Sequence, residues 1–500
     1  MSERWKVGVV AALLALVVGA IYWPVLGFTL IGDDFQWLQL ARAARHRPWL
    51  LLADLDGFWR PSSTWLLALT ELLWPGSSAA HHAVNLVLHA GVGLGLYLVG
   101  RRLGFSAWAA AVVGVLWVGS PFAGEPAFSV ACRHEDLLLL GWLSVCLAWP
   151  PADGRWSSGR VWLAVLGAGL AACSKETWVM TPGLVVALEV GLRRRPWWQA
   201  VRSGLRWTVP VVVYSAAHWL WLAGRGGYFS SAWRVLAKVP HELAAFWYLE
   251  GLVPLQFPFS WRGVLALALT AGAVWVGRSR AAVVVGLALL VLPTLPTLFV
   301  PYLPTRYTAI PYSGFLALIA GAAVQLASGL TPRQRRLALV GAGTMAALVL
   351  VAGVSIVRGD LDDIGRVSGA HARLLAEAQQ AAATFPIAVP VVHVRAENES
   401  PLPAVAATPR GLPKLYFPRH EDPYGLVDVA ALFDFVLAGK GLQVRILPDN
   451  DPRLQGPGSL LLHRSGGFAW RPAPTPLATA IGAARAQGFY ARALLATPIR

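Results

Sequence analysis

The first 357 residues alternate between long apolar segments and short polar connections. Several apolar windows exceed the ~18 residues that mark a membrane-spanning helix. This pattern predicts a polytopic α-helical membrane protein with about 11 transmembrane helices (11–13). The candidate spans are residues 7–30, 81–100, 106–123, 127–149, 161–173, 177–192, 207–223, 263–277, 281–300, 311–328 and 337–357.

Two apolar segments, residues 7–30 and residues 236–256, are interpreted from the residues around them. Residues 7–30 follow a cationic start and have no small-residue cleavage site before Asp33. They also exceed the ~7–15 apolar residues of a signal peptide, so we expect a retained first span. Residues 236–256 are apolar enough to span, but a span there would place Arg278 and Arg280 outside. We therefore expect that segment to be interfacial or re-entrant.

The pattern changes after Arg358. A polar helical stretch beginning GDLDDIG is followed by strand-like runs, VPVVHVRAE, PKLYFPR, LQVRILP and SLLLHRSGGFAW, with a helical VDVAALFDFVLAG among them. These runs predict a small α/β domain. We divide the chain into a transmembrane domain, residues 1–357, and an extracytoplasmic α/β domain, residues 358–500.

Composition and charge support this division. The chain is 56% hydrophobic and only 14% charged, whereas a soluble domain usually carries about 25% charged residues. Its formal net charge of +16 would suggest a nucleic-acid partner in a soluble protein. Here the arginines gather on alternate short loops, a pattern that sets orientation in a bilayer. We therefore expect no nucleic acid, a bacterial inner (plasma) membrane location and a cytoplasmic N-terminus.

Ionisable side chains gather on the predicted outer face. They occur in the segments GDDF, FWRPSSTW, EPAFSVACRHED, SKE and PTRYT. Ionisable groups near membrane depth are functional candidates by default. The candidates are Asp33, Asp34, Arg60, Arg133, His134, Lys175, Glu176, Arg306 and Tyr307.

Each candidate also has a structural interpretation. Asp33 and Asp34 could cap an interfacial helix. Arg133 could reach lipid headgroups, and Lys175 and Glu176 could form an ion pair. A further group, His82, Asn85 and His89, falls on one helix face, where we favour interhelical hydrogen bonds over a metal site.

This set of residues suits group transfer from an anionic lipid carrier. When a sugar leaves a polyprenyl phosphate, cations must balance the phosphate charge, and Arg133, Lys175 and Arg306 could do so. The acceptor hydroxyl must lose a proton to a carboxylate within hydrogen-bond reach, and Asp33 or Asp34 could act as that base. The pair could also hold a divalent metal ion, but two aspartates are equally useful without one, so the sequence establishes no metal or cofactor requirement.

Six segments carry a resemblance to a known family, and they occur in the family's order: GDDF, FWRPSSTW, HHAVNLVLHAGVGLGLYLVGRRLG, EPAFSVACRHEDLLLL, ACSKETWVMTP and PTRYTAIPYSGF. Through them the chain resembles GT-C integral-membrane glycosyltransferases. The likeness is greatest to bacterial relatives of protein O-mannosyltransferases and of transmembrane-plus-tetratricopeptide mannosyltransferases. The resemblance implies a first-loop acid at the active site, here Asp33 or Asp34. It also implies a basic lipid-phosphate site, here including Arg133, Lys175 and Arg306.

Two departures from the family bear on the acceptor, a protein or glycan. The chain has no tetratricopeptide array, and the usual RPL reads RPS. The sequence thus predicts an inverting, mannosyltransferase-like enzyme that uses a polyprenyl-phosphate sugar. The alternative is a transporter or flippase for lipid-linked saccharides, although no inverted repeat is evident.

Overall fold

A computed structural model describes residues 2–31, 34–52, 58–221, 239–240, 242–249, 261–277, 280–297 and 305–383. It also describes four strands, residues 391–395, 443–446, 459–464 and 467–471. Asp33, the PKLYFPR run and the expected helix VDVAALFDFVLAG lie outside the described residues.

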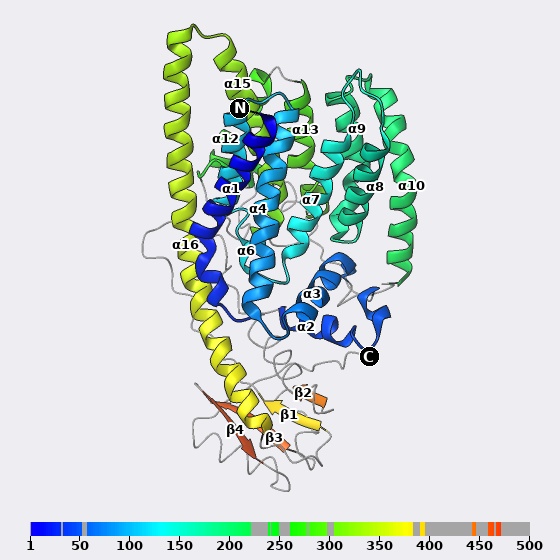
Figure 1. Cartoon of the computed structure of the whole chain (residues 1–500), viewed down its shortest axis with the longest axis vertical. Coiled ribbons are helices and arrows are strands. Elements are labelled where there is room, and N and C mark those ends of the chain that lie inside the picture. Colours follow the sequence, from blue (N-terminus) through cyan, green and yellow to red (C-terminus); the bar gives the residue numbers. More distant parts are fainter. Residues whose placement is uncertain are drawn as a thin grey trace.

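The chain up to residue 383 forms a helical bundle (Figure 1). Its first half contains α1 (Glu3–Tyr22), η1 (Trp23–Gly27), α2 (Asp34–Ala43), η2 (Pro48–Leu52), α3 (Pro61–Leu73), α4 (Ser78–Arg102), α5 (Ala107–Val118), α6 (Glu125–Phe128) and α7 (Arg133–Ala148). Its second half contains α8 (Ser158–Ala172), η3 (Glu176–Met180), α9 (Thr181–Gly191), α10 (Trp197–Trp221), α12 (Trp261–Val276), α13 (Arg280–Val291), α14 (Thr294–Thr297), η4 (Thr305–Thr308), α15 (Ala309–Ser328) and α16 (Pro332–Ala383).

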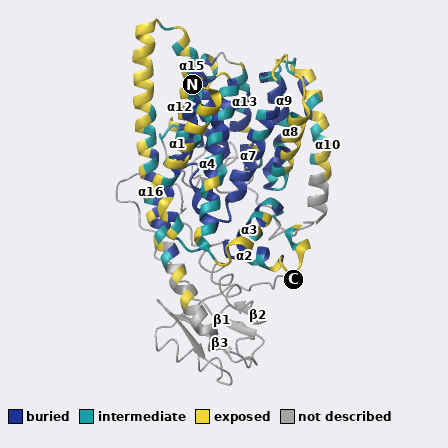
Figure 2. Cartoon of the chain, in the orientation of Figure 1, coloured by how far each residue is buried: buried dark blue, intermediate teal, exposed yellow. Residues whose placement is uncertain are grey.

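The bundle has helices and an exterior surface suited to a membrane. Five helical stretches among the described residues are long and apolar enough to cross one: Glu3–Gly27, Ser78–Arg102, Arg280–Thr297, Arg306–Ser328 and Pro332–Arg366. The upper half of α16 is exposed (Figure 2), and Leu337, Val340 and Leu348 lie on its surface. Such an apolar exterior suits lipid, and the protein is an integral membrane protein. The total of about 11 spans stays a prediction.

Local sequence signals explain where several helices start. Ser77, Ser106 and Ser157 precede α4, α5 and α8, and each side chain accepts a hydrogen bond from a backbone N–H in the first turn. Serine is a favoured N-cap because its hydroxyl satisfies an otherwise unpaired amide.

Small residues let the helices approach closely. Gly141 of α7 and Gly167 of α8 face each other so tightly that a Cβ at Gly141 would lie 2.6 Å from the Gly167 carbonyl oxygen. Gly93 of α4 and Gly114 of α5 make a similar contact, 2.7 Å from a Cβ at Gly114 to the Gly93 oxygen. Close glycine contacts are typical of packing between membrane helices.

The two ends of the bundle differ in character. The N-terminus and the α4–α5, α9–α10 and α15–α16 connections lie at one end, while α2 and α3 lie at the other (Figure 1). The first end carries the arginine-rich connections, which include Arg101, Arg102 and Arg193–Arg195. The candidate active-site residues lie towards the second end.

Three elements differ from the hydropathy pattern. The expected span 127–149 begins only at Arg133, because residues 125–128 form the separate helix α6, with Pro126 in its first turn. The described part of 236–256 is residues 239–240 and 242–249, with a helical turn at 242–246 whose Leu243 and Phe246 are buried in the bundle. Burial within the protein fits a re-entrant segment better than an interfacial one.

The third difference concerns the last span. The polar stretch after Arg358 continues the same helix, so α16 extends without a break to Ala383. The expected domain boundary at residue 357 therefore falls inside one helix.

Below α16 the described strands form one mixed sheet in the order β2-β1-β3-β4 (Figure 1). The strands are β1 (Val391–Arg395), β2 (Gln443–Ile446), β3 (Ser459–Arg464) and β4 (Gly467–Arg471). β1 pairs in parallel with β2 and β3, whereas β3 and β4 are antiparallel. Three of the four strand-like runs thus contain strands, and the α/β domain as a whole stays a prediction.

Candidate active site

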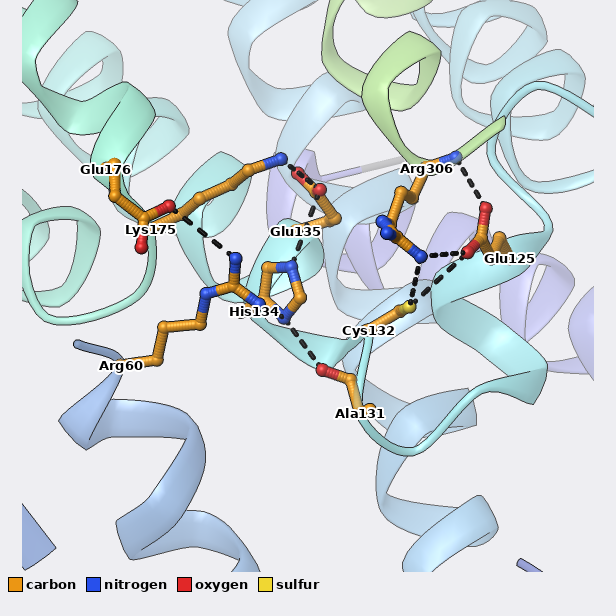
Figure 3. A network of polar contacts seen from close by, with 9 residues as sticks. All are labelled: Arg60, Glu125, Ala131, Cys132, His134, Glu135, Lys175, Glu176 and Arg306. Atoms are coloured by element: carbon orange, nitrogen blue, oxygen red, sulfur yellow. Dashed lines mark hydrogen bonds and ion pairs between the residues drawn. The ribbon is translucent and has the colours of Figure 1, made fainter. Parts of the chain in front are cut away.

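The start of α7 is the centre of a buried polar network (Figure 3). Side chains reach it from the beginning of α3, from the SKE tip between α8 and η3, and from η4. Five of the nine candidates lie in this network: Arg60, His134, Lys175, Glu176 and Arg306. Asp34 contacts it through Ala131, and Tyr307 contacts it through Lys175. Arg133 makes other contacts, and Asp33 lies outside the described residues.

Lys175 pairs with Glu135, the residue that follows His134. Its ammonium donates to Glu135 Oε1, and both side chains are buried. The same ammonium lies 4.1 Å from the centre of the Tyr307 ring. The ion pair that we weighed between Lys175 and Glu176 is therefore wrong, because the Lys175 charge is balanced by Glu135 and by the face of Tyr307.

His134 has a defined orientation. Its Nδ1 lies 2.7 Å from the Ala131 carbonyl oxygen and 3.3 Å from Arg60 Nη1. A carbonyl only accepts and a guanidinium only donates, so Nδ1 cannot satisfy both. The shorter contact favours an Nδ1–H that donates to Ala131. His134 Nε2 then faces Glu135 Oε1 at 3.5 Å.

Arg60 is the cation with the weakest protein partners. Its Nη2 lies 3.6 Å from Glu176 Oε2, which is longer than a hydrogen bond. Its Nε is buried and has no partner among the described residues. The guanidinium packs over Phe58 and Trp37, at 4.5 and 5.8 Å from the ring centres. Arg60 is therefore a buried guanidinium that retains donors for an anionic ligand.

Arg60 also affects Glu176 in the SKE tip. Burial, the largest single influence, would raise the pKa of Glu176, but the positive charge of Arg60, a backbone hydrogen bond and the charge of Lys175 together lower it. Glu176 thus stays charged at neutral pH and balances Arg60 in the absence of a ligand.

Arg306 is held by Glu125 at the N-terminus of α6. Its backbone N–H donates to Glu125 Oε2 at 2.7 Å, and its Nη1 donates to Oε1 at 2.9 Å. The Cys132 thiol donates to the same Oε1 at 3.4 Å. Arg306 lies 5.4 Å from the Tyr307 ring centre, so Tyr307 stands beside both Lys175 and Arg306.

Asp34 begins α2 and is completely buried. Its Oδ1 accepts from the Ala131 N–H at 2.6 Å and its Oδ2 accepts from the Ile31 N–H at 3.1 Å. Ala131 is the residue whose carbonyl orients His134. Asp34 thus connects the first loop to the start of α7, whereas its neighbour Asp33 lies outside the described residues.

Arg133 does not join the network in Figure 3. It is completely buried, and it donates to the carbonyl oxygens of Val130, from Nε at 3.1 Å, and His81, from Nη2 at 3.2 Å. These contacts do not reach Arg60, Lys175 or Arg306, and Arg133 Nη1 is buried with no hydrogen-bond partner among the described residues. Complete burial argues against the headgroup contact that we considered.

Two of the three polar residues expected on one face of α4, Asn85 and His89, make interhelical hydrogen bonds, as the sequence favoured. His82 does not, because both of its ring nitrogens are buried with no hydrogen-bond partner among the described residues. Asn85 donates to the carbonyls of Pro126 and Ser129 at 2.9 and 2.8 Å. His89 lies 3.3 Å from Asp136 of α7. Within the described part of the chain, no three His, Cys, Asp or Glu side chains are grouped to hold a metal ion.

The departure from RPL to RPS has a structural role. The backbone N–H and the hydroxyl of Ser62 both donate to the Cys173 carbonyl, at 2.9 and 2.8 Å. The Ser62 hydroxyl also lies 2.9 Å from that of Ser174. Ser62 thus fastens the start of α3, with Arg60, to the tip that carries Lys175.

Sequence reasoning named Glu125 and Glu135 among the outer acidic residues but did not include them in the site. Their partners are 181 and 40 residues away along the chain. Their position in GEPAFSVACRHED, the most charge-rich outer segment, was the available signal.

Comparisons with known proteins identify the fold. No protein-family profile matches the chain. No curated sequence matches it. Among solved structures, ArnT from Cupriavidus metallidurans in the apo state superposes with a TM-score of 0.53 at 16% identity, covering 90% of this chain and 87% of ArnT. ArnT bound to undecaprenyl phosphate gives a TM-score of 0.51, with the same identity and coverage. The chain therefore has the fold of ArnT, a GT-C glycosyltransferase.

Proposed function

We propose that the protein is a membrane glycosyltransferase that moves a sugar from a polyprenyl-phosphate donor to an acceptor hydroxyl on the extracytoplasmic side. The observation that carries the proposal is Arg60, a buried guanidinium with weak protein partners, in the same polar network as Lys175 and Arg306. The undecaprenyl phosphate bound to ArnT, a protein of the same fold, supports a lipid phosphate as the ligand.

In this proposal Arg60 contacts the donor phosphate directly. A phosphate oxygen would gain charge-assisted hydrogen bonds from the guanidinium. Lys175 and Arg306 form ion pairs with Glu135 and Glu125, so they add little net charge. What they can offer a phosphate are the N–H groups that these carboxylates do not use. Arg133 supports the start of α7 instead of contacting the phosphate.

Asp33 is the proposed base. Asp34 uses both carboxylate oxygens to hold backbone N–H groups, which suits a structural role. Asp33 is its neighbour in the GDDF motif and carries the remaining carboxylate. In the transfer, Asp33 takes the acceptor hydroxyl proton while the oxygen bonds to the anomeric carbon. The bond from that carbon to the phosphate oxygen breaks, and its electron pair leaves with the polyprenyl phosphate.

This single displacement inverts the anomeric centre. Arg60, aided by Lys175 and Arg306, stabilises the negative charge that develops on the leaving phosphate. We also propose that the transferred sugar is of the mannosyl type and that the acceptor is a protein or a glycan. A divalent ion at the acidic motif is not needed for these steps.

The test uses purified protein in lipid nanodiscs with radiolabelled polyprenyl-phosphate sugars. Release of polyprenyl phosphate is measured with and without cell-envelope acceptors, for wild type and for Arg60→Gln and Arg60→Lys. We expect Arg60→Gln to weaken donor binding strongly. Arg60→Lys should recover only part of it, because an ammonium lacks the planar fork of a guanidinium.

Arg47→Gln is the matched control, since Arg47 is an exposed arginine in the same loop region. It should leave donor affinity unchanged. Equal donor affinity in Arg60→Gln and wild type would remove Arg60 from the phosphate site. Translocation of the lipid without sugar transfer would instead favour a flippase.

A further inference from the structure

The loop that carries the acidic motif is attached to α16. The backbone N–H of Thr29 donates to the Ser368 hydroxyl at 2.7 Å, although the two residues are 339 positions apart. The Ser368 side chain is only 3% exposed. A part-buried, short hydrogen bond to a loop amide fixes the loop better than a fully solvent-exposed one would.

Neighbouring contacts show that this attachment is part of a longer interface between α16 and the end of the first span. Arg358 of α16 donates to the Ala20 carbonyl at the end of α1, at 3.2 Å. One turn before Ser368, Gly365 leaves room for Phe28, because a Cβ there would lie 3.3 Å from the Phe28 ring. Helix α16 therefore packs along the exit of the first span up to Thr29.

The other end of the loop is also fixed. Asp34 binds the Ile31 and Ala131 amides, and Ala131 orients His134. Asp33 lies between these two anchors in the sequence, four residues after Thr29 and one before Asp34. One anchor connects the loop to α7, and the other connects it to α16.

We propose that Ser368 is a positioning residue that sets the first-loop acid for transfer, and that α16 is the connection through which the C-terminal region holds this loop. The inference rests on the proposed function. It assigns the polar part of α16 a role in catalysis in addition to its role as a link to the sheet.

The chemistry requires such an anchor. A base must stay within hydrogen-bond reach of the acceptor hydroxyl, and a displacement of about 1 Å can reduce rate by ~10²-fold. Donor binding depends on Arg60, Lys175 and Tyr307, none of which contacts Ser368 among the described contacts. Loss of the Ser368 hydroxyl should therefore lower kcat while the donor KM stays near that of wild type.

The experiment compares Ser368→Ala, Ser368→Thr and Ser355→Ala in nanodiscs. Ser355 is an exposed serine on the same helix, so its variant controls for the removal of a hydroxyl from α16. We expect Ser368→Ala to lower kcat on the order of 10-fold or more, with donor KM changed less than about 2-fold. Ser368→Thr keeps the acceptor oxygen and should recover most of the rate, and Ser355→Ala should match wild type.

A second readout does not depend on activity. Hydrogen-exchange mass spectrometry on a peptide that covers residues 24–38 should show faster exchange in Ser368→Ala than in wild type or Ser355→Ala. If wild type transfers no sugar, the proposed function fails while this exchange difference still tests the attachment. If Ser368→Ala does not fold, Ser368→Cys keeps the shape with a weaker acceptor and replaces it in both measurements.

Two results would overturn the proposal. One is an unchanged exchange rate in the 24–38 peptide of Ser368→Ala. The other is a fall in rate that Ser368→Thr does not recover, or that comes with an equal rise in donor KM, because either would indicate a general disturbance of the bundle.

Discussion

At the scale of single residues, Asp33 and Asp34 are predicted to separate into two roles. Asp33→Asn should remove the proposed base and lower kcat by ~10²–10⁴-fold with little effect on stability. Asp34→Asn should destabilise the fold by about 1–3 kcal/mol, because an amide nitrogen would then face a backbone N–H donor of Ile31 or Ala131. Turnover kinetics and thermal unfolding of both variants check this. The reverse pattern, with Asp34→Asn stable and inactive, would exchange the roles.

The sequence located these charges but could not pair them. Most of its candidates lie in the structure's network or contact it, because ionisable side chains are rarely retained near membrane depth without a use. Their partners follow from tertiary contacts that adjacency does not predict: Lys175 selects Glu135, not the adjacent Glu176. Likewise, two neighbouring aspartates look equivalent in the sequence, and only the contact with Ala131 distinguishes Asp34.

At the scale of elements, Glu71 joins α2, α3 and α4. Its carboxylate accepts from Arg42 at 2.7 Å and from the Gly76 N–H at 3.2 Å, and it lies 3.2 Å from His81. Burial alone would raise the pKa of Glu71, but the His81 hydrogen bond and the Arg42 charge outweigh it and lower the pKa below 4.5. A lowered pKa stabilises the folded state above pH 4.5, and this contribution is lost as the pH falls through the lowered value.

The lowered pKa of Glu71 can be tested by thermal unfolding at pH 7 and pH 4. The Tm of wild type should fall between these pH values by more than that of Glu71→Gln, which has no carboxylate to protonate. Glu3→Gln is the control, because Glu3 pairs with Lys6 at an exposed site where an ion pair adds little. An equal fall in wild type and Glu71→Gln would show that Glu71 does not couple pH to the packing of α2 and α3.

Glycine contacts set the distance between α7 and α8. Gly141→Ala would place its Cβ 2.6 Å from the Gly167 carbonyl, so the helices must separate. We expect a loss of about 1–3 kcal/mol in the free energy of unfolding. Gly169→Ala on α8 meets nothing within 4 Å and should be neutral or slightly stabilising, since alanine favours a helix. Denaturation of both variants in the same detergent compares them directly, and equal stability would contradict the packing role.

At the scale of the whole molecule, hydropathy predicted the membrane bundle well but misplaced its breaks. Apolar windows do not reveal that Pro126 lies in a separate short helix, residues 125–128, because the flanking residues are apolar as well. The charged run from Arg133 to Asp136, inside the expected span, marks where α7 begins. The sequence also divided α16 at residue 357, where composition turns polar, although the backbone hydrogen bonds continue to Ala383. A change from apolar to polar composition shows where a helix leaves the membrane. It does not show where the helix ends.

The length of α16 predicts on which side of the membrane its second half lies. With 52 residues at 1.5 Å each, it is about 78 Å long, whereas the hydrocarbon core is ~30 Å thick. Its start lies at the arginine-rich end of the bundle, so its second half must project from the opposite face, with the sheet beyond it (Figure 1). Because arginine-rich loops favour the cytoplasm, that projecting half is predicted to be extracytoplasmic.

Cysteine labelling tests this orientation. Ser157 is exposed at the arginine-rich end, and Ala372 is exposed on the projecting half of α16. A membrane-impermeant maleimide should label Ala372→Cys in cells whose inner membrane is intact, and Ser157→Cys only after that membrane is opened. The native Cys132 and Cys146 are buried and give little background, and Cys173, which is partly exposed, is replaced by serine in both variants. Labelling of Ser157→Cys alone in intact cells would invert the topology, and it would place the proposed transfer on the cytoplasmic side.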